Sequence, residues 1–233
     1  MANEAAVVVG VGPGLGQALV DAFAGAGYTV LAAARRASQL AGLDGRDGRV
    51  FAVDCDATDP AQVDALFARV GEQGLSLAAA LYNAGVFEPG RVADIEPTDF
   101  ERCWRIGCFG GFLVGRAAAR LMREAGKGTI LFTGATASLR GAAGFANLAS
   151  PKFALRALAQ SMARELGPEG IHVAHVIIDG QIRSERFTHL LKERGPDSLL
   201  EPAAIADAYL ALHRQHRSAW TDEICLRPWV EKF

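Results

Sequence analysis

The stretch that decides the fold is Val7-Val8-Val9-Gly10-Val11-Gly12-Pro13-Gly14-Leu15-Gly16. Residues 5–9 form a continuous apolar run of strand length. After the glycines, Leu15, Leu19 and Phe23 recur at helical spacing until Gly25 and Gly27 end the pattern. The glycines therefore mark the turn from a predicted strand to a predicted helix.

This turn has the chemistry of a phosphate site. Glycine lets the backbone approach a ligand closely, and the free N–H groups and positive dipole of a helix N-terminus favour an anion. The alternative is an ordinary glycine turn. Because further strand-helix units follow, the pattern favours binding of a dinucleotide pyrophosphate. We assign that role to Gly10, Gly12, Pro13, Gly14, Leu15 and Gly16.

The same alternation continues along the chain. Further strands are predicted at residues 28–34, 50–53, 77–82, 129–132, 171–178 and 223–227, with helical patterns between them. A parallel sheet with helices on both faces accounts for this order. We predict a single-domain α/β Rossmann-type doubly wound fold over residues 1–233, in which residues 180–201 form a substrate loop.

Two features of the predicted helices can be tested against a structure. Ser150-Pro151 is typical of an N-cap followed by proline at the first helical position. A long helix beginning near Pro97 contains Gly107, Gly110, Gly111 and Gly115, each of which costs about 1 kcal/mol relative to alanine. Close helix packing would explain these glycines, either within the fold or against another subunit.

Composition excludes several classes of protein. The net charge of −2, with 21% charged residues, gives no electrostatic footprint for nucleic acid. No apolar stretch approaches the roughly 20 residues of a membrane span, and the N-terminus has no secretory pattern. Cys55, Cys103, Cys108 and Cys225 have neither CxxC nor zinc-type spacing. We expect a cytoplasmic protein with buried reduced thiols, no metal, no nucleic-acid partner and no membrane partner.

The end of the second predicted strand bears on cofactor choice. An acidic residue there would accept a hydrogen bond from the ribose 2′-hydroxyl of NAD(H) and repel a 2′-phosphate. Here the chain reads Ala34-Arg35-Arg36, without a carboxylate. Either arginine can pair with a phosphate, although both could simply be solvated. The sequence favours NADP(H) over NAD(H).

Three motifs together resemble the short-chain dehydrogenase/reductase family: Gly10-xxx-Gly14-x-Gly16, Tyr82-Asn83-Ala84-Gly85, and Lys152 in the helix after the fifth strand. The resemblance implies that Asn83, Ala84 and Gly85 line the adenine-ribose side. It also implies that Asp56, followed by Ala57, orients the adenine and that Lys152 holds the nicotinamide ribose. By the same resemblance, Gly180, Ile182 and Ser184 match the cofactor-contacting turn after the sixth strand.

The family's other catalytic positions do not match. The resemblance places a tyrosine four residues before the lysine, where this chain has Leu148. The family serine falls on Ala135, or on Gly134 with a shift of one residue, and the family asparagine falls on Gly107. General acid/base groups contribute about 10²–10⁴-fold to rate. The sequence therefore predicts an atypical member that lacks the catalytic Tyr, Ser and Asn.

Several alternatives remain open from the sequence. Asp179 follows an apolar strand and could act as a general acid with a raised pKa, or could only cap its turn or pair with Arg183. His175 is expected to be a core histidine.

The leading hypothesis is an NADP(H)-dependent oxidoreductase acting on a small carbonyl, alcohol or imine through Lys152 and Asp179. The rival hypotheses are a catalytically silent NADP(H)-binding sensor or oligomer partner, and non-redox chemistry by Asp179 and Lys152. The resemblance also implies a homodimer or homotetramer.

Overall fold

The computed structural model describes residues 3–40, 42–43, 45 and 48–231. Its centre is one seven-stranded sheet in the order β3-β2-β1-β4-β5-β6-β7, with every pair parallel. The strands are β1 (Glu4–Val9), β2 (Thr29–Ala34), β3 (Val50–Asp54), β4 (Ser76–Tyr82), β5 (Gly128–Thr133), β6 (Ile171–Ile178) and β7 (Glu223–Leu226). The strand order reverses between β1 and β4, which is where a doubly wound sheet opens a crevice for ligands.

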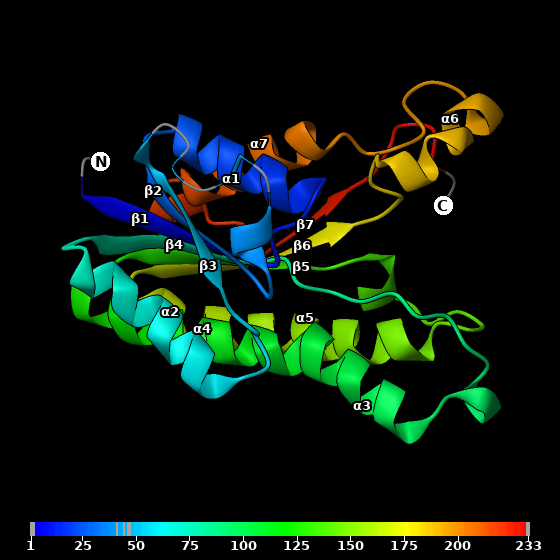
Figure 1. Ribbon diagram of the computed structural model, residues 1–233, viewed down its shortest axis with the longest axis horizontal. Helices are drawn as coiled ribbons and strands as arrows, with labels where there is room; N and C mark the ends of the chain where they lie inside the picture. Colours follow the sequence, from blue (N-terminus) through cyan, green and yellow to red (C-terminus); the bar gives the residue numbers. More distant parts are fainter. Residues whose placement is uncertain (1–2, 41, 44, 46–47, 232–233) are drawn as a thin grey trace.

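Helices cover both faces of this sheet. α1 (Leu15–Gly25) and α7 (Pro202–His213) lie on one face, and α2 (Pro60–Glu72), α4 (Gly110–Ala125) and α5 (Ala146–Leu166) lie on the other (Figure 1). Two shorter helices, α3 (Pro97–Trp104) and α6 (His189–Arg194), lie toward the carboxyl ends of the strands. The predicted fold class is confirmed.

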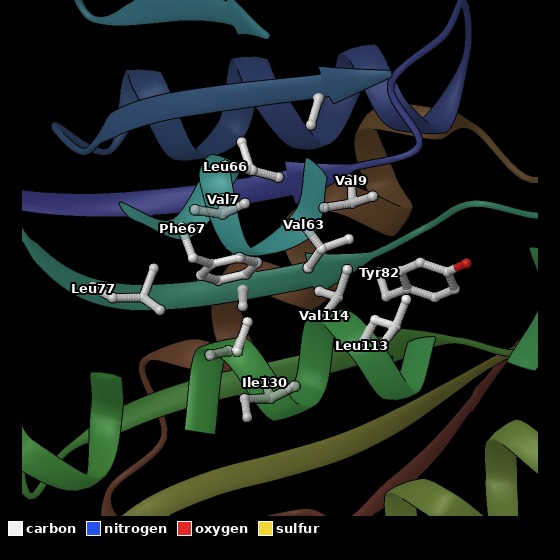
Figure 2. Packing of buried hydrophobic residues seen from close by; sticks show 14 of the residues in the cluster. Val7, Val9, Val63, Leu66, Phe67, Leu77, Tyr82, Leu113, Val114 and Ile130 are labelled. Carbon is white, nitrogen blue, oxygen red and sulfur yellow. The ribbon is translucent and has the colours of Figure 1, made fainter. Parts of the chain in front are cut away.

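Alternating side chains of each strand enter two separate cores. Val7 and Val9 of β1 belong to the core under α2 and α4, whereas Ala6 and Val8 belong to the core under α1 and α7. Figure 2 shows the first of these cores, with Tyr82 at its edge near Val114 and Leu113. Since both sheet faces are covered, the central strands are buried on both sides, which explains their nearly unbroken apolar runs.

The start of α5 corrects one prediction. The helix begins at Ala146 rather than at Ser150-Pro151, so Pro151 lies inside it. A proline here has no N–H to donate to the carbonyl four residues earlier. The first turn is held instead by Leu148 and Ala149, whose backbone N–H groups both donate to the Phe145 carbonyl.

The glycines of the α3–α4 region pack inward. A Cβ on Gly107 would lie 2.6 Å from Pro151 Cβ, and a Cβ on Gly111 would lie 2.5 Å from a Leu155 methyl group. Both partners are on α5, so the glycines permit close packing of helices within the chain. A π-helical turn at Arg105–Phe109 joins α3 to α4.

Residues 180–201 fold into more than a loop. They contain a short 3₁₀ turn at Glu185–Phe187 and helix α6, and a bridge between Ile182 and Leu200 closes the segment at its base.

Among the described residues, no helix has the length and apolar character needed to cross a bilayer. The cysteines are unpaired, and three of them are buried, but Cys225 is exposed, contrary to the prediction.

Candidate functional site

A cavity of about 510 Å³ opens at the carboxyl ends of the central strands, where the strand order reverses. Ten of its lining residues are ones that the sequence assigned to a dinucleotide: Gly10, Gly12, Pro13, Arg35, Arg36, Asp56, Ala57, Asn83, Ala84 and Gly85. The fold thus brings together four strand-end segments, after β1, β2, β3 and β4, that are far apart in the sequence.

The glycines of the first turn do two different jobs. Gly10 has a φ of +92°, and a Cβ there would lie 2.3 Å from the backbone nitrogen of Ala84. A Cβ on Gly16 would lie 2.7 Å from the Gly10 carbonyl oxygen. Gly12 and Gly14, by contrast, have nothing within 4 Å of a built Cβ. Gly10 and Gly16 therefore serve packing, and the open side of the turn is at Gly12 and Gly14.

The N-terminus of α1 is uncapped by any side chain. Gly14 is the N-cap residue, and Leu15 begins the helix with no acidic residue in its first turn. The first N–H groups of a helix have no partner within it and carry partial positive charge. This end of α1 therefore offers N–H donors and partial positive charge, and binding of an anion there stays a prediction.

Asn83 ties the two central strands together at the cavity floor. Its side-chain amide donates to the Gly10 carbonyl oxygen at 3.0 Å, and its backbone N–H donates to the Val9 carbonyl at 2.8 Å. The amide thus holds the glycine turn against β4. This is a structural role for Asn83 at the cavity wall, next to Ala84 and Gly85.

The wall beyond β2 carries positive charge. Arg35 and Arg36 are exposed at the end of β2 and line the cavity. The nearest carboxylate by register, Asp54 at the end of β3, accepts two hydrogen bonds from Ser38, which lower its pKa. No carboxylate therefore occupies the position at the end of β2 that would select a free 2′-hydroxyl.

Asp56 is held in place by Thr58 through one of its two carboxylate oxygens. Its Oδ1 accepts from the backbone N–H and the hydroxyl of Thr58, both at 2.8 Å. Its Oδ2 makes no hydrogen bond with any residue in the described part of the chain and is left to accept one from a ligand at the cavity wall.

Lys152 is a buried cation near the cavity. Its side chain is 5% exposed, and Nζ donates to the Thr133 carbonyl oxygen at 2.7 Å. Nζ also lies 3.7 Å from a Cβ built on Gly85, so it faces the cavity-lining segment after β4. Burial lowers the pKa of Lys152 to about 8. An ammonium has three donors, and two of them remain for hydroxyl groups of a ligand.

Four positions lie close to Lys152 or to its partner Thr133, and the two glycines among them have packing reasons for lacking a side chain. Leu148 lies one helical turn before Lys152, and Ala135 begins a tight turn in which its N–H donates to Ser138 Oγ at 3.1 Å. A Cβ on Gly134 would lie 2.4 Å from the His175 ring. Gly107 faces Pro151, as described above.

His175 is a core residue, as expected. It is fully buried, its Nδ1 lies 3.5 Å from Glu223 Oε2, and burial lowers its pKa to about 4. The ring is therefore neutral at pH 7.

Asp179 lies at the end of β6 and is 7% exposed. It accepts a hydrogen bond from Thr136 Oγ1 at 2.6 Å and forms an ion pair with Arg227. Arg183, the partner that the sequence suggested, pairs instead with Glu201 at 2.5 Å. The prediction of the pair Asp179–Arg183 was wrong because β7 lies beside β6, and Arg227 directly follows β7.

The remaining predicted residues lie outside the 510 Å³ cavity. These are Gly14, Leu15, Gly16, Lys152, Asp179, Gly180, Ile182 and Ser184. Gly180 has a φ of +151°, and a Cβ there would lie 2.9 Å from Pro228. Ile182 pairs with Leu200, and Ser184 precedes the 3₁₀ turn. Their cofactor contacts stay a prediction.

The sequence missed part of the cavity wall. Thr58, Glu88, Arg102 and Ile106 also line it. Arg102 donates to both carboxylate oxygens of Glu88 and to Asp99. Thr58 follows β3, Glu88 follows β4, Arg102 lies on α3 and Ile106 lies in the π-helical turn after it. None of these positions belongs to a recognised motif, so only their position in space reveals them.

Comparisons with known proteins agree with this geometry. Residues 4–194 match the family model described as short chain dehydrogenase. The chain is 29% identical over 199 residues to 3-oxoacyl-[acyl-carrier-protein] reductase MabA of Mycobacterium avium, covering 85% of this chain and 74% of that protein. It is 28% identical to 3alpha-hydroxysteroid dehydrogenase of Mediterraneibacter gnavus, covering 95% and 94%.

A solved structure is similar over its whole length. The short-chain dehydrogenase from Rhodopseudomonas palustris has 38% sequence identity and a TM-score of 0.84, covering 97% of this chain and 99% of that one. With the family model spanning most of the chain and the glycine turn, Asn83 and Lys152 in place, the protein belongs to the short-chain dehydrogenase family of oxidoreductases.

Proposed function

We propose that the protein is an NADP(H)-dependent oxidoreductase acting on a small carbonyl, alcohol or imine. The observation that carries the proposal is Lys152, a buried ammonium with one protein hydrogen bond and two free donors. A buried cation costs stability unless it has a partner, so its retention favours a ligand with hydroxyl groups beside it. Nicotinamide cofactors, which members of this family bind, have such hydroxyls on the ribose.

The preference for NADP(H) rests on the end of β2. Arg35 and Arg36 line the cavity where an acidic residue would otherwise select NAD(H). Arg105 lines an adjoining cavity of about 260 Å³ that also contains Arg35, whereas Arg102 in the same lining is already paired with Glu88 and Asp99. The guanidinium groups of Arg35 and Arg36 therefore carry the preference for a ligand with an additional phosphate.

In this proposal the cofactor would donate the hydride to a carbonyl or imine, or accept it from an alcohol, and the chain's residues would bind the cofactor, orient it and exchange a proton. Gly12, Gly14 and the N-terminus of α1 hold the pyrophosphate, and Lys152 orients the ribose. The family's tyrosine, serine and asparagine are replaced by Leu148, Ala135 and Gly107. Asp179 is proposed as the acid/base group. Reduction of an already cationic imine requires no general acid, and alcohol oxidation requires a group that accepts the hydroxyl proton, which a carboxylate can do.

A second candidate is a catalytically silent NADP(H)-binding protein. The apolar side chain of Leu148 beside Lys152 favours it, because no phenol is present for the lysine to activate. Non-redox chemistry by Asp179 and Lys152 is a third candidate, under which dinucleotide binding should be weak.

Calorimetric titration with NADPH and, separately, NADH tests the cofactor. We expect binding of NADPH to be tighter by about tenfold or more and this preference to be lost in Arg35→Ala, since one charge-assisted contact contributes about 1.5–3 kcal/mol. No binding of either nucleotide would refute the proposal.

A panel of carbonyls, alcohols and imines then tests turnover. Turnover that is abolished in Lys152→Ala supports the oxidoreductase. Tight NADPH binding without turnover supports the silent protein. Asp179→Asn should slow turnover without weakening NADPH binding if Asp179 exchanges the proton.

Assembly and location are also proposals. Trp104, Phe109 and Phe112 form a stacked series, with ring centroids 6.2 and 6.3 Å apart, and Trp104 and Phe112 are 39% and 40% exposed. Exposed aromatic groups of this kind favour association. We propose a homodimer or homotetramer in the cytoplasm. Light scattering should give at least twice the mass of 24.6 kDa, and Phe112→Lys should reduce it.

A further inference from the structure

A second cavity, of about 420 Å³, lies at the amino-terminal ends of the strands, the edge where the N-terminus is marked in Figure 1. β6 has eight residues, so the two edges of the sheet are roughly 25 Å apart at about 3.3 Å per residue. The cavity is bounded by the starts of β1, β5 and β6 and by the chain after α7. It is thus separate from the cofactor site.

The lining of this cavity has an excess of positive charge. Lys127 pairs with Glu4 at 2.8 Å, and Glu4 is the sole acidic residue of the lining. Arg214 and Arg217 also line the cavity and are exposed. Across the described residues, no acidic side chain lies within ion-pair distance of either arginine. Two guanidinium groups therefore have their charge available to an anion.

The wall of the cavity contains a hydroxyl group whose hydrogen is not donated to His213. His213 contacts Thr129 Oγ1 through Nδ1 and the Tyr28 hydroxyl through Nε2, both at 2.9 Å. Burial lowers the pKa of His213 to about 4, so the ring is neutral at pH 7 and donates from one nitrogen only. In either tautomer one hydroxyl, of Thr129 or of Tyr28, keeps its hydrogen for another acceptor. Both residues line the cavity.

The segment that carries the arginines is held in place before any ligand binds. Trp220 stacks on His172 with ring centroids 5.0 Å apart and an interplanar angle of 2°. The Trp220 indole N–H donates to the Gln215 carbonyl, and the Gln215 side chain bonds both the N–H and the hydroxyl of Thr221. Arg217 lies within this closed turn. A preorganised cationic turn loses less entropy on binding than a mobile one.

From these observations we propose that the cavity binds a small phosphorylated molecule. Its phosphate pairs with Arg214 and Arg217, and the hydroxyl chain of Tyr28, His213 and Thr129 donates one hydrogen bond to an oxygen of the ligand. Guanidinium groups match the geometry of phosphate oxygens, and the volume lies within the usual range for small-molecule sites. An adjoining cavity of about 350 Å³ shares Arg217 and Trp220 and leaves room for the remainder of the molecule.

Calorimetric titration at constant ionic strength tests this site, with ribose 5-phosphate, inorganic phosphate and D-ribose as probes. We expect ribose 5-phosphate to bind and D-ribose not to bind. In the variant Arg214→Gln/Arg217→Gln, affinity should fall about tenfold or more. Both side chains are exposed, so the variant should keep the melting temperature of the parent protein within a few degrees.

A matched variant distinguishes this cavity from the cofactor site. Arg35→Gln/Arg36→Gln removes two arginines at the opposite edge of the sheet and should change the affinity for ribose 5-phosphate less than twofold. Equal affinity for inorganic phosphate supports free phosphate as the ligand, and tighter binding of the ribose ester supports a phosphorylated metabolite. Three results would overturn the proposal. They are no binding of either ribose 5-phosphate or inorganic phosphate, unchanged affinity for ribose 5-phosphate in Arg214→Gln/Arg217→Gln, and loss of ribose 5-phosphate binding in Arg35→Gln/Arg36→Gln.

Discussion

Replacing Lys152 with methionine should make the cofactor-free protein more stable while removing its cofactor binding. Lys152 is buried, has one hydrogen bond to the protein and forms no ion pair in the described part of the chain. Methionine has a similar length and no charge, so it fills the same space without the cost of desolvating an ammonium. Under the proposed function, binding of the cofactor ribose would offset this cost in the complex.

The size of this effect follows from the pKa of Lys152. Burial lowers this pKa from 10.5 to about 8, which at 1.36 kcal/mol per pKa unit corresponds to about 3 kcal/mol. Losing the hydrogen bond to the Thr133 carbonyl costs the variant about 1 kcal/mol. Lys152→Met should therefore raise the free energy of unfolding by about 2 kcal/mol at pH 7.

The dependence on pH has a definite sign. The pKa of Lys152 is lower in the folded protein than in the unfolded chain. The destabilising cost of burying the Lys152 ammonium is therefore fully present below pH 8, where the folded protein carries that charge. Between about pH 8 and pH 10.5 the unfolded chain binds more protons than the folded one, so the stability of the parent protein rises relative to the variant. The advantage of Lys152→Met should therefore shrink across this window.

Urea unfolding followed by circular dichroism at pH 7, 8, 9 and 10 measures this difference. Lys192→Met serves as a control, since Lys192 is exposed on α6 and the change should alter stability by less than about 0.5 kcal/mol. A Lys152→Met variant that is less stable than the parent at pH 7, or a difference that does not change with pH, would refute the reasoning.

Three further outcomes are expected. Gly10→Ala should lower the free energy of unfolding by about 3 kcal/mol or more in urea, because of its positive φ and a 2.3 Å contact, whereas Gly12→Ala should stay within about 0.5 kcal/mol of the parent. As pH falls from 6.5 toward 4, stability should drop, because unfolded His213 and His175 each take up a proton that the folded rings do not; His213→Gln should remove the His213 part and leave a smaller drop in a pH series of urea titrations. Gly107→Ala should cost about 1–3 kcal/mol, and Pro151→Ala should recover much of it, which a double-mutant cycle measures.

Much of the fold could be predicted because its signals are local. Strands buried on both faces read as unbroken apolar runs, and the stripe of Val63, Leu66 and Phe67 marks α2 without any tertiary information. The start of α5 was missed because it depends on tertiary packing, which local signals do not contain. Local preference places Pro151 in the first turn of a helix, but packing of its ring against Gly107 allows it inside one.

The candidate site could be predicted only where one short segment supplies both the turn and the ligand contact. The glycine turn and the arginines after β2 satisfy this condition, and both line the cavity. Arg102 and Glu88 do not, because they reach the cavity from segments whose relative position depends on the whole fold. The partner of Asp179 was wrong for a similar reason, since Arg227 is 48 residues away in sequence and adjacent only across the β6–β7 pair.

The small residues around Lys152 are better understood as a set than one by one. Gly107 leaves the space that the Pro151 ring occupies, and Gly134 leaves the space of the His175 ring, with contacts of 2.6 and 2.4 Å to a built Cβ. A polar side chain at either position would have to displace a buried ring, so restoring a single family residue here should destabilise the protein before it could improve catalysis. The proposed departure from the family's catalytic set is therefore built into the core packing of α5 and β6, and a gain of conventional activity should require paired changes in these contacts.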